Sequence, residues 1–187
     1  MKKPLIVVAL RDELPHDEFL GIPVCHTGIG KVNAAVQTMN AILAYQPDCI
    51  INYGTAGALL DHLTGLLPVL AVCQRDVDCN ELAPRGMFPG ENELFLTGAA
   101  SRGVVCGTGD SFVTDPDEWT KRTCDIVDME LYAIAKACKI MNISWFSVKF
   151  VSDKADKDAI LNWKQTVSLG EEHFKDWLID WQKRRQT

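Results

Sequence analysis

Three groups of acidic residues stand directly after apolar runs, where their side chains can do chemistry. They are Asp12 and Glu13 in ALRDEL, Asp128 and Glu130 in IVDMEL, and Asp153 in KFVSDKAD. Carboxylates that converge at one rim of an α/β sheet suit general acid–base catalysis on a polar substrate. Taken singly, each acid is explained more simply as a cap on the helix that follows its strand. The occurrence of all three groups at strand ends is what predicts a site.

Glycine-containing turns also follow the apolar runs: TGIGK at 27–31, GTAG at 54–57 and GTGDSF at 107–112. Ligands of open α/β sheets bind beyond the carboxyl ends of the strands, and glycine lets the backbone approach them closely. One such turn alone is more often a plain loop. GIGK has neither the spacing of a P-loop nor the full dinucleotide-binding pattern, so a triphosphatase or a dehydrogenase is unsupported.

The elements that must position these residues alternate between short apolar strands and helices of 3.6-residue period, which predicts a mostly parallel α/β sheet. The segment 75–98 is the one long irregular stretch, and such a loop is often a lid or a binding loop. Strands are predicted at 5–10, 22–27, 48–53, 67–72, 103–108 and 144–152, and helices at 31–45, 128–141 and 167–185.

Composition and charge exclude several classes of protein. The chain has 187 residues, is 47% hydrophobic and carries a formal charge of −6, which predicts one globular domain over 1–187 and no nucleic-acid partner. The apolar run Leu5–Leu10 is too short for a signal peptide, and no apolar segment reaches the ~20 residues that cross a membrane. We therefore expect a cytoplasmic protein that does not bind membranes.

The cysteines and histidines show no pattern of metal ligands. The seven cysteines are odd in number and contain no C-x-x-C pair, so buried reduced thiols are favoured over disulfides or zinc. The four histidines are scattered without ligand spacing. We predict no metal and no other cofactor.

The motifs TGIGKVNAA, INYGTAGAL, GTGDSF, VDMELYAIA and VSDKAD, in this order, resemble the purine nucleoside phosphorylase and nucleosidase superfamily. The resemblance is greatest to the methylthioadenosine/S-adenosylhomocysteine nucleosidases and extends from residue 5 to residue 156. It implies a shortened three-layer α/β/α domain with a mostly parallel central mixed sheet, and a homodimer. It also implies hydrolysis of the N-glycosidic bond of a purine nucleoside.

The resemblance assigns roles to residues of this chain. Asp153 would protonate the departing purine at N7, and Glu13 would position the attacking water. Glu130 would bind the ribose hydroxyls. In this interpretation Asp128 is a helix cap. The remaining substrate-binding residues that the resemblance implies are Met129 against the sugar, Phe112 and Val113 at the base, Ser152 and Thr55.

Two alternatives stay open. A phosphate-dependent phosphorylase needs cationic phosphate ligands, and Arg11 in the first-strand loop is a candidate, although Glu13 beside it would repel phosphate. Tyr53 occupies a position where another phosphate ligand is expected, and this favours water over phosphate as the nucleophile. A non-catalytic nucleoside-binding or storage relative is the other alternative, and the presence of Glu13, Glu130 and Asp153 together argues against it.

The substrate beyond a purine nucleoside is less defined. Asp153, rather than an asparagine, favours a 6-amino purine because a carboxylate can also accept from N6–H. The segment LAPRGMFPG at 82–90 could cover a 5′-alkylthio group through Met87 and Phe88, or be an ordinary surface loop.

Overall fold

A computed structural model describes residues 3–185 of the chain. Within this range, nine strands form one mixed sheet. The strands are β1 (Pro4–Val8), β2 (Glu18–Phe19), β3 (Ile22–His26), β4 (Cys49–Ala58), β5 (Leu66–Gln74), β6 (Leu96–Thr97), β7 (Val104–Thr108), β8 (Ile126–Asp128) and β9 (Ser144–Asp153). The α-helices are α1 (Lys31–Tyr45), α2 (Glu118–Thr123), α3 (Leu131–Ile140), α4 (Ala159–Thr166) and α5 (Glu171–Arg184), and one 3₁₀ helix spans Asn80–Leu82.

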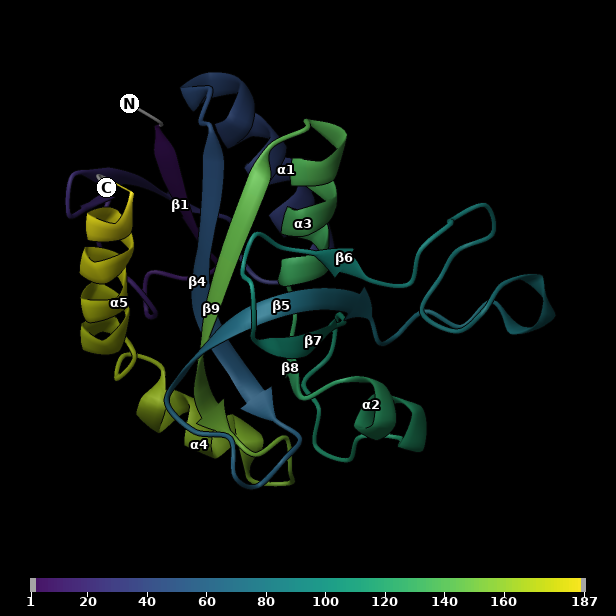
Figure 1. Ribbon diagram of the computed structural model, residues 1–187. Coiled ribbons are helices and arrows are strands. Elements are labelled where there is room, and N and C mark those ends of the chain that lie inside the picture. Colours follow the sequence, from purple (N-terminus) through teal and green to yellow (C-terminus); the bar gives the residue numbers. More distant parts are fainter. Residues whose placement is uncertain (1–2, 186–187) are drawn as a thin grey trace.

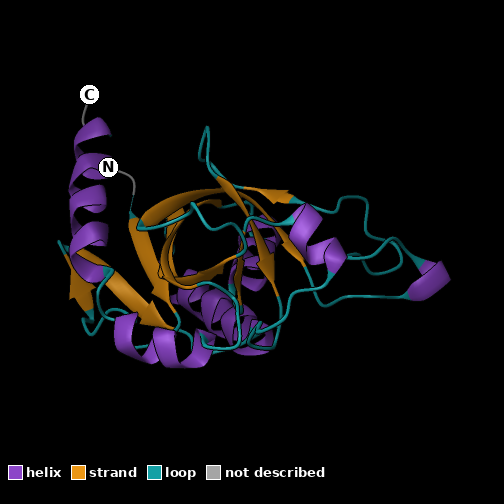
Figure 2. Ribbon diagram, turned by 90° about the horizontal axis from the view of Figure 1, so that it is seen from below, coloured by secondary structure: helices purple, strands orange, loops and turns teal. Residues whose placement is uncertain are grey.

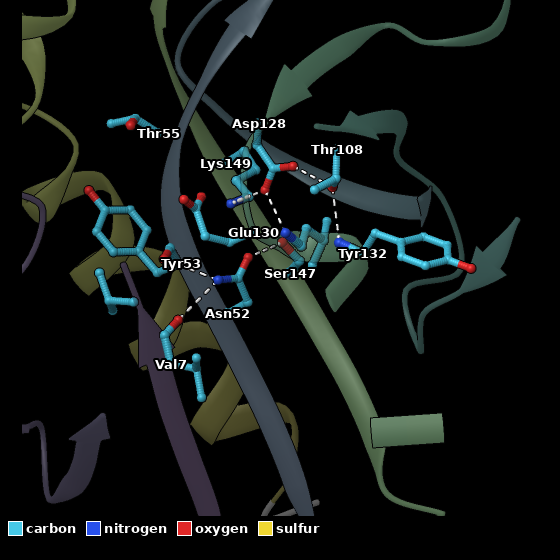
Figure 3. A network of polar contacts seen from close by, with 12 residues as sticks. Val7, Asn52, Tyr53, Thr55, Thr108, Asp128, Glu130, Tyr132, Ser147 and Lys149 are labelled. Carbon is cyan, nitrogen blue, oxygen red and sulfur yellow. Dashed lines mark hydrogen bonds and ion pairs between the residues drawn. The ribbon is translucent and has the colours of Figure 1, made fainter. Parts of the chain in front are cut away.

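Three parallel strands, β1, β4 and β9, form the centre of the sheet. Ile51 of β4 lies between Ile6 of β1 and Phe146 of β9 in the register of the sheet. Apolar residues fill both faces here, as expected for strands that are covered by helices on both sides. Asn52 is a polar exception: its amide donates to the Val7 carbonyl at 3.0 Å and accepts from the Ser147 hydroxyl at 2.8 Å (Figure 3).

The sheet closes on itself. β4 pairs with both β8 and β9, β8 pairs with β7, β7 with β5, and β5 pairs in turn with β9. These five strands form a ring, which Figure 2 shows along its axis. The closure brings the ends of strands that are distant in the sequence to one side of the molecule.

Helices cover the sheet in two layers, which confirms the predicted three-layer α/β/α class. α1 and α3 pack together on one side of the sheet, and α5 lies on the other (Figure 1). The buried face of α5 presents Phe174, Leu178 and Trp181. Its apolar spacing of three and four residues is what predicted a closing helix at the C-terminal end.

The six predicted strands and the helix over 31–45 are confirmed, while some short elements were not predicted. The chain from 159 to 184 forms two helices, α4 and α5, where one was expected over 167–185. Glycine at 170 separates them, and its α-carbon lies so close to Tyr53 that a Cβ would be 2.4 Å from the hydroxyl. Strands β2, β6 and β8 and helix α2 are too short for periodicity to reveal.

All seven cysteines lie within residues 3–185 and none forms a disulfide. Five are buried, among them Cys73 and Cys124, whose sulfurs are 3.6 Å apart. Within the same range, no helix is both long enough and apolar enough to cross a bilayer.

Candidate active site

A cavity opens at the ends of β1, β4, β7, β8 and β9. Its wall combines apolar side chains with four carboxylates from three separate parts of the chain: Glu13, Asp128, Glu130 and Asp153. The structure brings every residue of the predicted site to this cavity: Glu13, Thr55, Phe112, Val113, Met129, Glu130, Ser152 and Asp153. Asp12, the acid next to Glu13, is exposed and is not among the lining residues.

Glu13 is a buried carboxylate with an unequal set of partners. Its Oε1 accepts from the Thr55 backbone N–H at 2.7 Å and from the Thr55 hydroxyl at 2.8 Å. Its Oε2 accepts from the Leu10 N–H at a longer 3.2 Å. Leu10 follows β1 and Thr55 lies within β4, so two strands of the parallel centre fix Glu13 from two sides. Oε2 is the oxygen with hydrogen-bonding capacity to spare.

Glu130 lies at the start of α3, and its Oε1 accepts from the N–H of Gly30 at 2.9 Å. Gly30 adopts a φ of +93°, a conformation that other residues rarely take, and this turns its N–H toward the carboxylate. Burial, and then the charge of Asp128, raise the pKa of Glu130 to about 7. The TGIGK turn therefore supplies a donor to Glu130 within the cavity.

Asp128 and Lys149 form an ion pair next to Glu130 (Figure 3). Lys149 Nζ lies 2.8 Å from Asp128 Oδ2, which also accepts from the Leu131 N–H at 2.9 Å. The other oxygen of Asp128 accepts from the Thr108 hydroxyl at 2.5 Å. Burial alone would raise the pKa of Asp128, but Lys149 and these donors hold it below its ordinary value. The expectation that Asp128 caps the helix is confirmed, and the ion pair adds a second structural role.

Asp153 ends β9 and is buried at the cavity wall. Its Oδ1 accepts from the Ala155 N–H at 2.9 Å and its Oδ2 accepts from the Ser152 hydroxyl at 2.8 Å. Burial raises the pKa of Asp153 despite these two donors. The turn expected at 54–57 is instead part of β4, with an irregularity in its pairing to β9 at Gly57. A Cβ at Gly57 would lie 2.7 Å from Asp153 Oδ1, so glycine at this position makes room for the carboxyl group.

The loop after β7 carries Phe112 and Val113 to the mouth of the cavity. Arg75, at the end of β5, holds this loop: its guanidinium donates to the Gly109 carbonyl at 2.9 Å, to the Ser111 carbonyl and to the Ser111 hydroxyl at 3.3 Å. Phe112 itself is partly exposed, with an edge-to-face contact to Trp163 at 6.0 Å between ring centroids. An exposed aromatic ring at a cavity mouth is available for stacking on a planar ligand.

The two residues considered as phosphate ligands lie elsewhere. Arg11 is exposed and pairs with Asp17 at 2.5 Å. Tyr53 is completely buried in the core, where its ring stacks on Phe174 at 4.3 Å. Neither lines the cavity, and the one cation among residues 3–185 that does, Arg75, already donates to the loop that it holds.

The suggestion that segment 82–90 covers a 5′ group of a ligand in the same chain is wrong. The segment projects away from the sheet (Figure 1), and neither Met87 nor Phe88 lines the cavity. Arg85 ties the segment to α2 through Asp117 and lies over the ring of Trp119. Attachment to α2 at the outer edge of the sheet keeps the segment away from the cavity.

Comparison with known proteins identifies the family. The model of the phosphorylase superfamily matches residues 21–186. The chain belongs to the phosphorylase superfamily. One relative in this superfamily, the 5′-methylthioadenosine/S-adenosylhomocysteine nucleosidase of Buchnera aphidicola, is 32% identical over 178 residues, covering 82% of this chain and 75% of its own.

Solved structures share the phosphorylase-superfamily fold. A 5′-methylthioadenosine/S-adenosylhomocysteine nucleosidase of Helicobacter pylori superposes with a TM-score of 0.86 at 23% identity, covering 96% of this chain and 97% of its own. The futalosine hydrolase of the same organism superposes with a TM-score of 0.85 at 22% identity, covering 95% of this chain and 95% of its own. The name of the Helicobacter pylori nucleosidase specifies an adenine nucleoside with a sulfur-linked 5′ group.

Three residues of this phosphorylase-superfamily site were not among the sequence predictions of site residues: Arg75, Lys149 and Trp163. Arg75 stands in the segment that reads as irregular, and Lys149 lies inside an apolar strand, where a buried lysine is rare. That rarity is a usable signal, because a lysine in such a strand needs a buried acid as partner. Trp163 lies in α4, a helix that periodicity did not indicate.

Proposed function

We propose that this chain is a nucleosidase that hydrolyses the N-glycosidic bond of a purine nucleoside, with 5′-methylthioadenosine or S-adenosylhomocysteine as substrate. The observation that carries the proposal is the position of three buried carboxylates, Glu13, Glu130 and Asp153, on one cavity wall. The nucleosidase named among the relatives supports the choice of substrate. The products are the free base and the ribose derivative.

Asp153 is the proposed acid. Breaking the bond between C1′ and N9 leaves electrons on the purine, and a proton delivered to N7 makes the base a better leaving group. A carboxyl group performs this step only if it holds a proton near neutral pH. The burial that raises the pKa of Asp153 favours that protonated form. The Ser152 hydroxyl contact fixes the direction of the carboxyl group.

Glu130 is the proposed ribose ligand. An ionised carboxylate accepts charge-assisted hydrogen bonds from sugar hydroxyls, and its charge stabilises a cationic sugar in the transition state. Oε1 is occupied by Gly30, so Oε2 is directed to the ligand. Lys149, which pairs with Asp128, lowers the electrostatic free energy of an ionised Glu130 beside Asp128. Met129, next in the chain, supplies an apolar contact for the sugar.

Glu13 is the proposed water-positioning residue. With Oε1 held by both donors of Thr55, Oε2 accepts a proton from water as the water oxygen bonds to C1′. The proton released by water therefore goes to Glu13, and the proton on the purine comes from Asp153. Phosphorolysis is disfavoured because neither Arg11 nor Tyr53 lines the cavity.

The test is the release of free adenine from methylthioadenosine, adenosylhomocysteine and adenosine, first in phosphate-free buffer and then with phosphate. We expect release at equal rates in the two buffers, with the sulfur-substituted nucleosides preferred. Release that requires phosphate would establish a phosphorylase instead. The absence of release from all three nucleosides in both buffers would contradict enzymatic action on adenine nucleosides.

We propose in addition that the protein is a homodimer. The projecting segment 75–98 carries Leu82 and Phe88, which are 79% and 51% exposed, and α1 exposes Val32 and Val36. Large apolar side chains exposed on two elements are candidates for burial in an interface. A second copy would bury these residues and place apolar side chains near the cavity mouth, where Phe112 is also exposed.

Light scattering after size-exclusion chromatography tests the dimer, with an expected mass twice the 20.8 kDa of one chain. Leu82→Glu together with Val36→Glu should give a monomer with reduced turnover. Leu169→Glu is the matched control, because Leu169 is 58% exposed in the turn between α4 and α5. A monomeric mass for the wild-type protein at high concentration would contradict the homodimer, and it would have no bearing on the proposed reaction.

A further inference from the structure

Helix α4 places the indole of Trp163 at the wall of the candidate active site. The ring lies among the lining residues and contacts the edge of Phe112. Its Nε1–H donates to the hydroxyl of Thr55 at 3.0 Å. The helix is in turn attached to the end of β9, because the Thr166 hydroxyl donates to the Ser152 carbonyl at 2.9 Å. The indole is therefore held by the same strand end that carries Asp153.

The direction of the hydrogen bonds from Trp163 is fixed by chemistry. An indole N–H can only donate, so the Thr55 oxygen must be the acceptor. A hydroxyl has a single proton, and that proton is then free to go to Glu13 Oε1, which lies 2.8 Å away. The chain of donors runs from Trp163 through Thr55 to Glu13. Without the indole, the Thr55 hydroxyl has other rotamers and partners open to it.

The Thr55 contacts decide which oxygen of Glu13 remains for water. Oε1 receives two short hydrogen bonds from Thr55, whereas Oε2 receives one of 3.2 Å from Leu10. A displacement of the carboxylate oxygen by a fraction of an ångström changes the direction from which the bound water attacks C1′. A phenylalanine at 163 would provide the same apolar wall, so the N–H is the property of tryptophan that this argument requires.

We propose that Trp163 is a positioning residue for the nucleophilic water: it fixes the Thr55 hydroxyl, and through it the carboxylate of Glu13. The inference rests on the proposed nucleosidase function and extends it to α4. Trp163 acts through Thr55, so its loss affects the chemical step rather than the binding of the nucleoside.

The experiment compares steady-state kinetics of methylthioadenosine hydrolysis in wild type, Trp163→Phe, Thr55→Val and the double variant. Loss of one oriented hydrogen bond should lower kcat about tenfold in Trp163→Phe, with KM changed by less than about twofold. The double variant should be no slower than Thr55→Val alone, because the indole acts only through the hydroxyl. Trp177→Phe is the matched control: this tryptophan stacks in the core between Phe174 and Trp181.

Three kinetic results would overturn the inference: an unchanged kcat in Trp163→Phe, an increase in KM alone, or losses that multiply in the double variant. A second readout is independent of turnover. The indole N–H resonance of Trp163, identified by its absence from the spectrum of Trp163→Phe, should shift in Thr55→Val. An inactive wild type would overturn the proposed function and with it the positioning of water, whereas an active wild type without a shift of this resonance in Thr55→Val would overturn the inference alone.

Discussion

Lys149 Nζ lies 2.8 Å from Asp128 Oδ2 in the interior of the protein, and both side chains are almost completely excluded from water. Burial lowers the pKa of Lys149, but the charges of Asp128 and Glu130 outweigh this effect and leave the pKa raised. A buried ion pair contributes little net stability, yet removal of one partner leaves an uncompensated charge. The pair also lies close to Glu130, the residue proposed to bind the ribose. Loss of the pair should therefore affect both the stability of the fold and the electrostatics of the site.

Replacing Lys149 with methionine should therefore destabilise the fold strongly. We expect the free energy of unfolding in Lys149→Met to fall by about 3–5 kcal/mol, since Asp128 stays buried without its cation. Urea unfolding followed by circular dichroism measures this. Lys164→Met on the exposed side of α4 is the control and should change stability by less than about 0.5 kcal/mol. Equal stability of the two variants would mean that Asp128 is neutral in the native state.

Glu130 should make stability depend on pH. Its pKa is raised from 4.5 to about 7 in the folded protein. Between these values the folded state keeps a proton that the unfolded chain releases, so the free energy of unfolding falls as pH rises through this window. The loss should be on the order of 2–3 kcal/mol and absent from Glu130→Gln. Urea unfolding of both proteins at several pH values in the window checks this, and parallel curves would contradict it.

Asp153→Asn should separate catalysis from folding. The amide oxygen can still accept from the Ala155 N–H, and the amide NH2 can donate to the Ser152 hydroxyl oxygen in place of accepting from it, but the amide cannot donate an acidic proton to the purine. We expect kcat to fall by about 10²–10⁴, with the thermal midpoint of unfolding nearly unchanged. Asp156→Asn, a change of an exposed acid three residues along, is the control. Wild-type turnover in Asp153→Asn would remove this residue as the acid.

Arg75→Met should loosen the loop that carries Phe112. The change removes the donors to the Gly109 and Ser111 carbonyls, so the loop loses these two attachments and keeps the one from the Asp110 N–H to Asp76. Nucleoside binding then has to order the loop, and KM should rise about tenfold or more. Hydrogen exchange at residues 109–113 should become faster as well. Arg102→Met, at an exposed position before β7, should leave both measurements unchanged.

The long elements and the polar ends of the strands followed from the sequence. The runs that became β1, β4 and β9 are apolar on both faces, which is typical of strands between two helical layers. Their alternation with helices made the strands parallel, and parallel strands end at one edge. That local rule was enough to place Glu13 and Asp153 together, because each follows a strand of the same parallel group.

Other parts of the site depend on contacts that no local pattern encodes. β8 is antiparallel to β4, so the edge rule does not by itself bring Glu130 to Glu13. The ring closes because β9 pairs with β4 on one side and β5 on the other, and the closure carries Asp128 to Lys149. Pairing partners at such separations are chosen by packing of the whole sheet.

The sequence by itself determined the α/β class, the family motifs and the acids that reach the cavity, since these depend on residue type and local period. Only the tertiary structure decided which acid pairs with a buried cation, which acid has a raised pKa, and which groups orient Glu13. Trp163 donates to Thr55 across 108 positions of sequence, and Lys149 meets Asp128 across a closed ring of strands. Burial and charge at a point in space are sums over neighbours, and those neighbours exist only once the chain has folded.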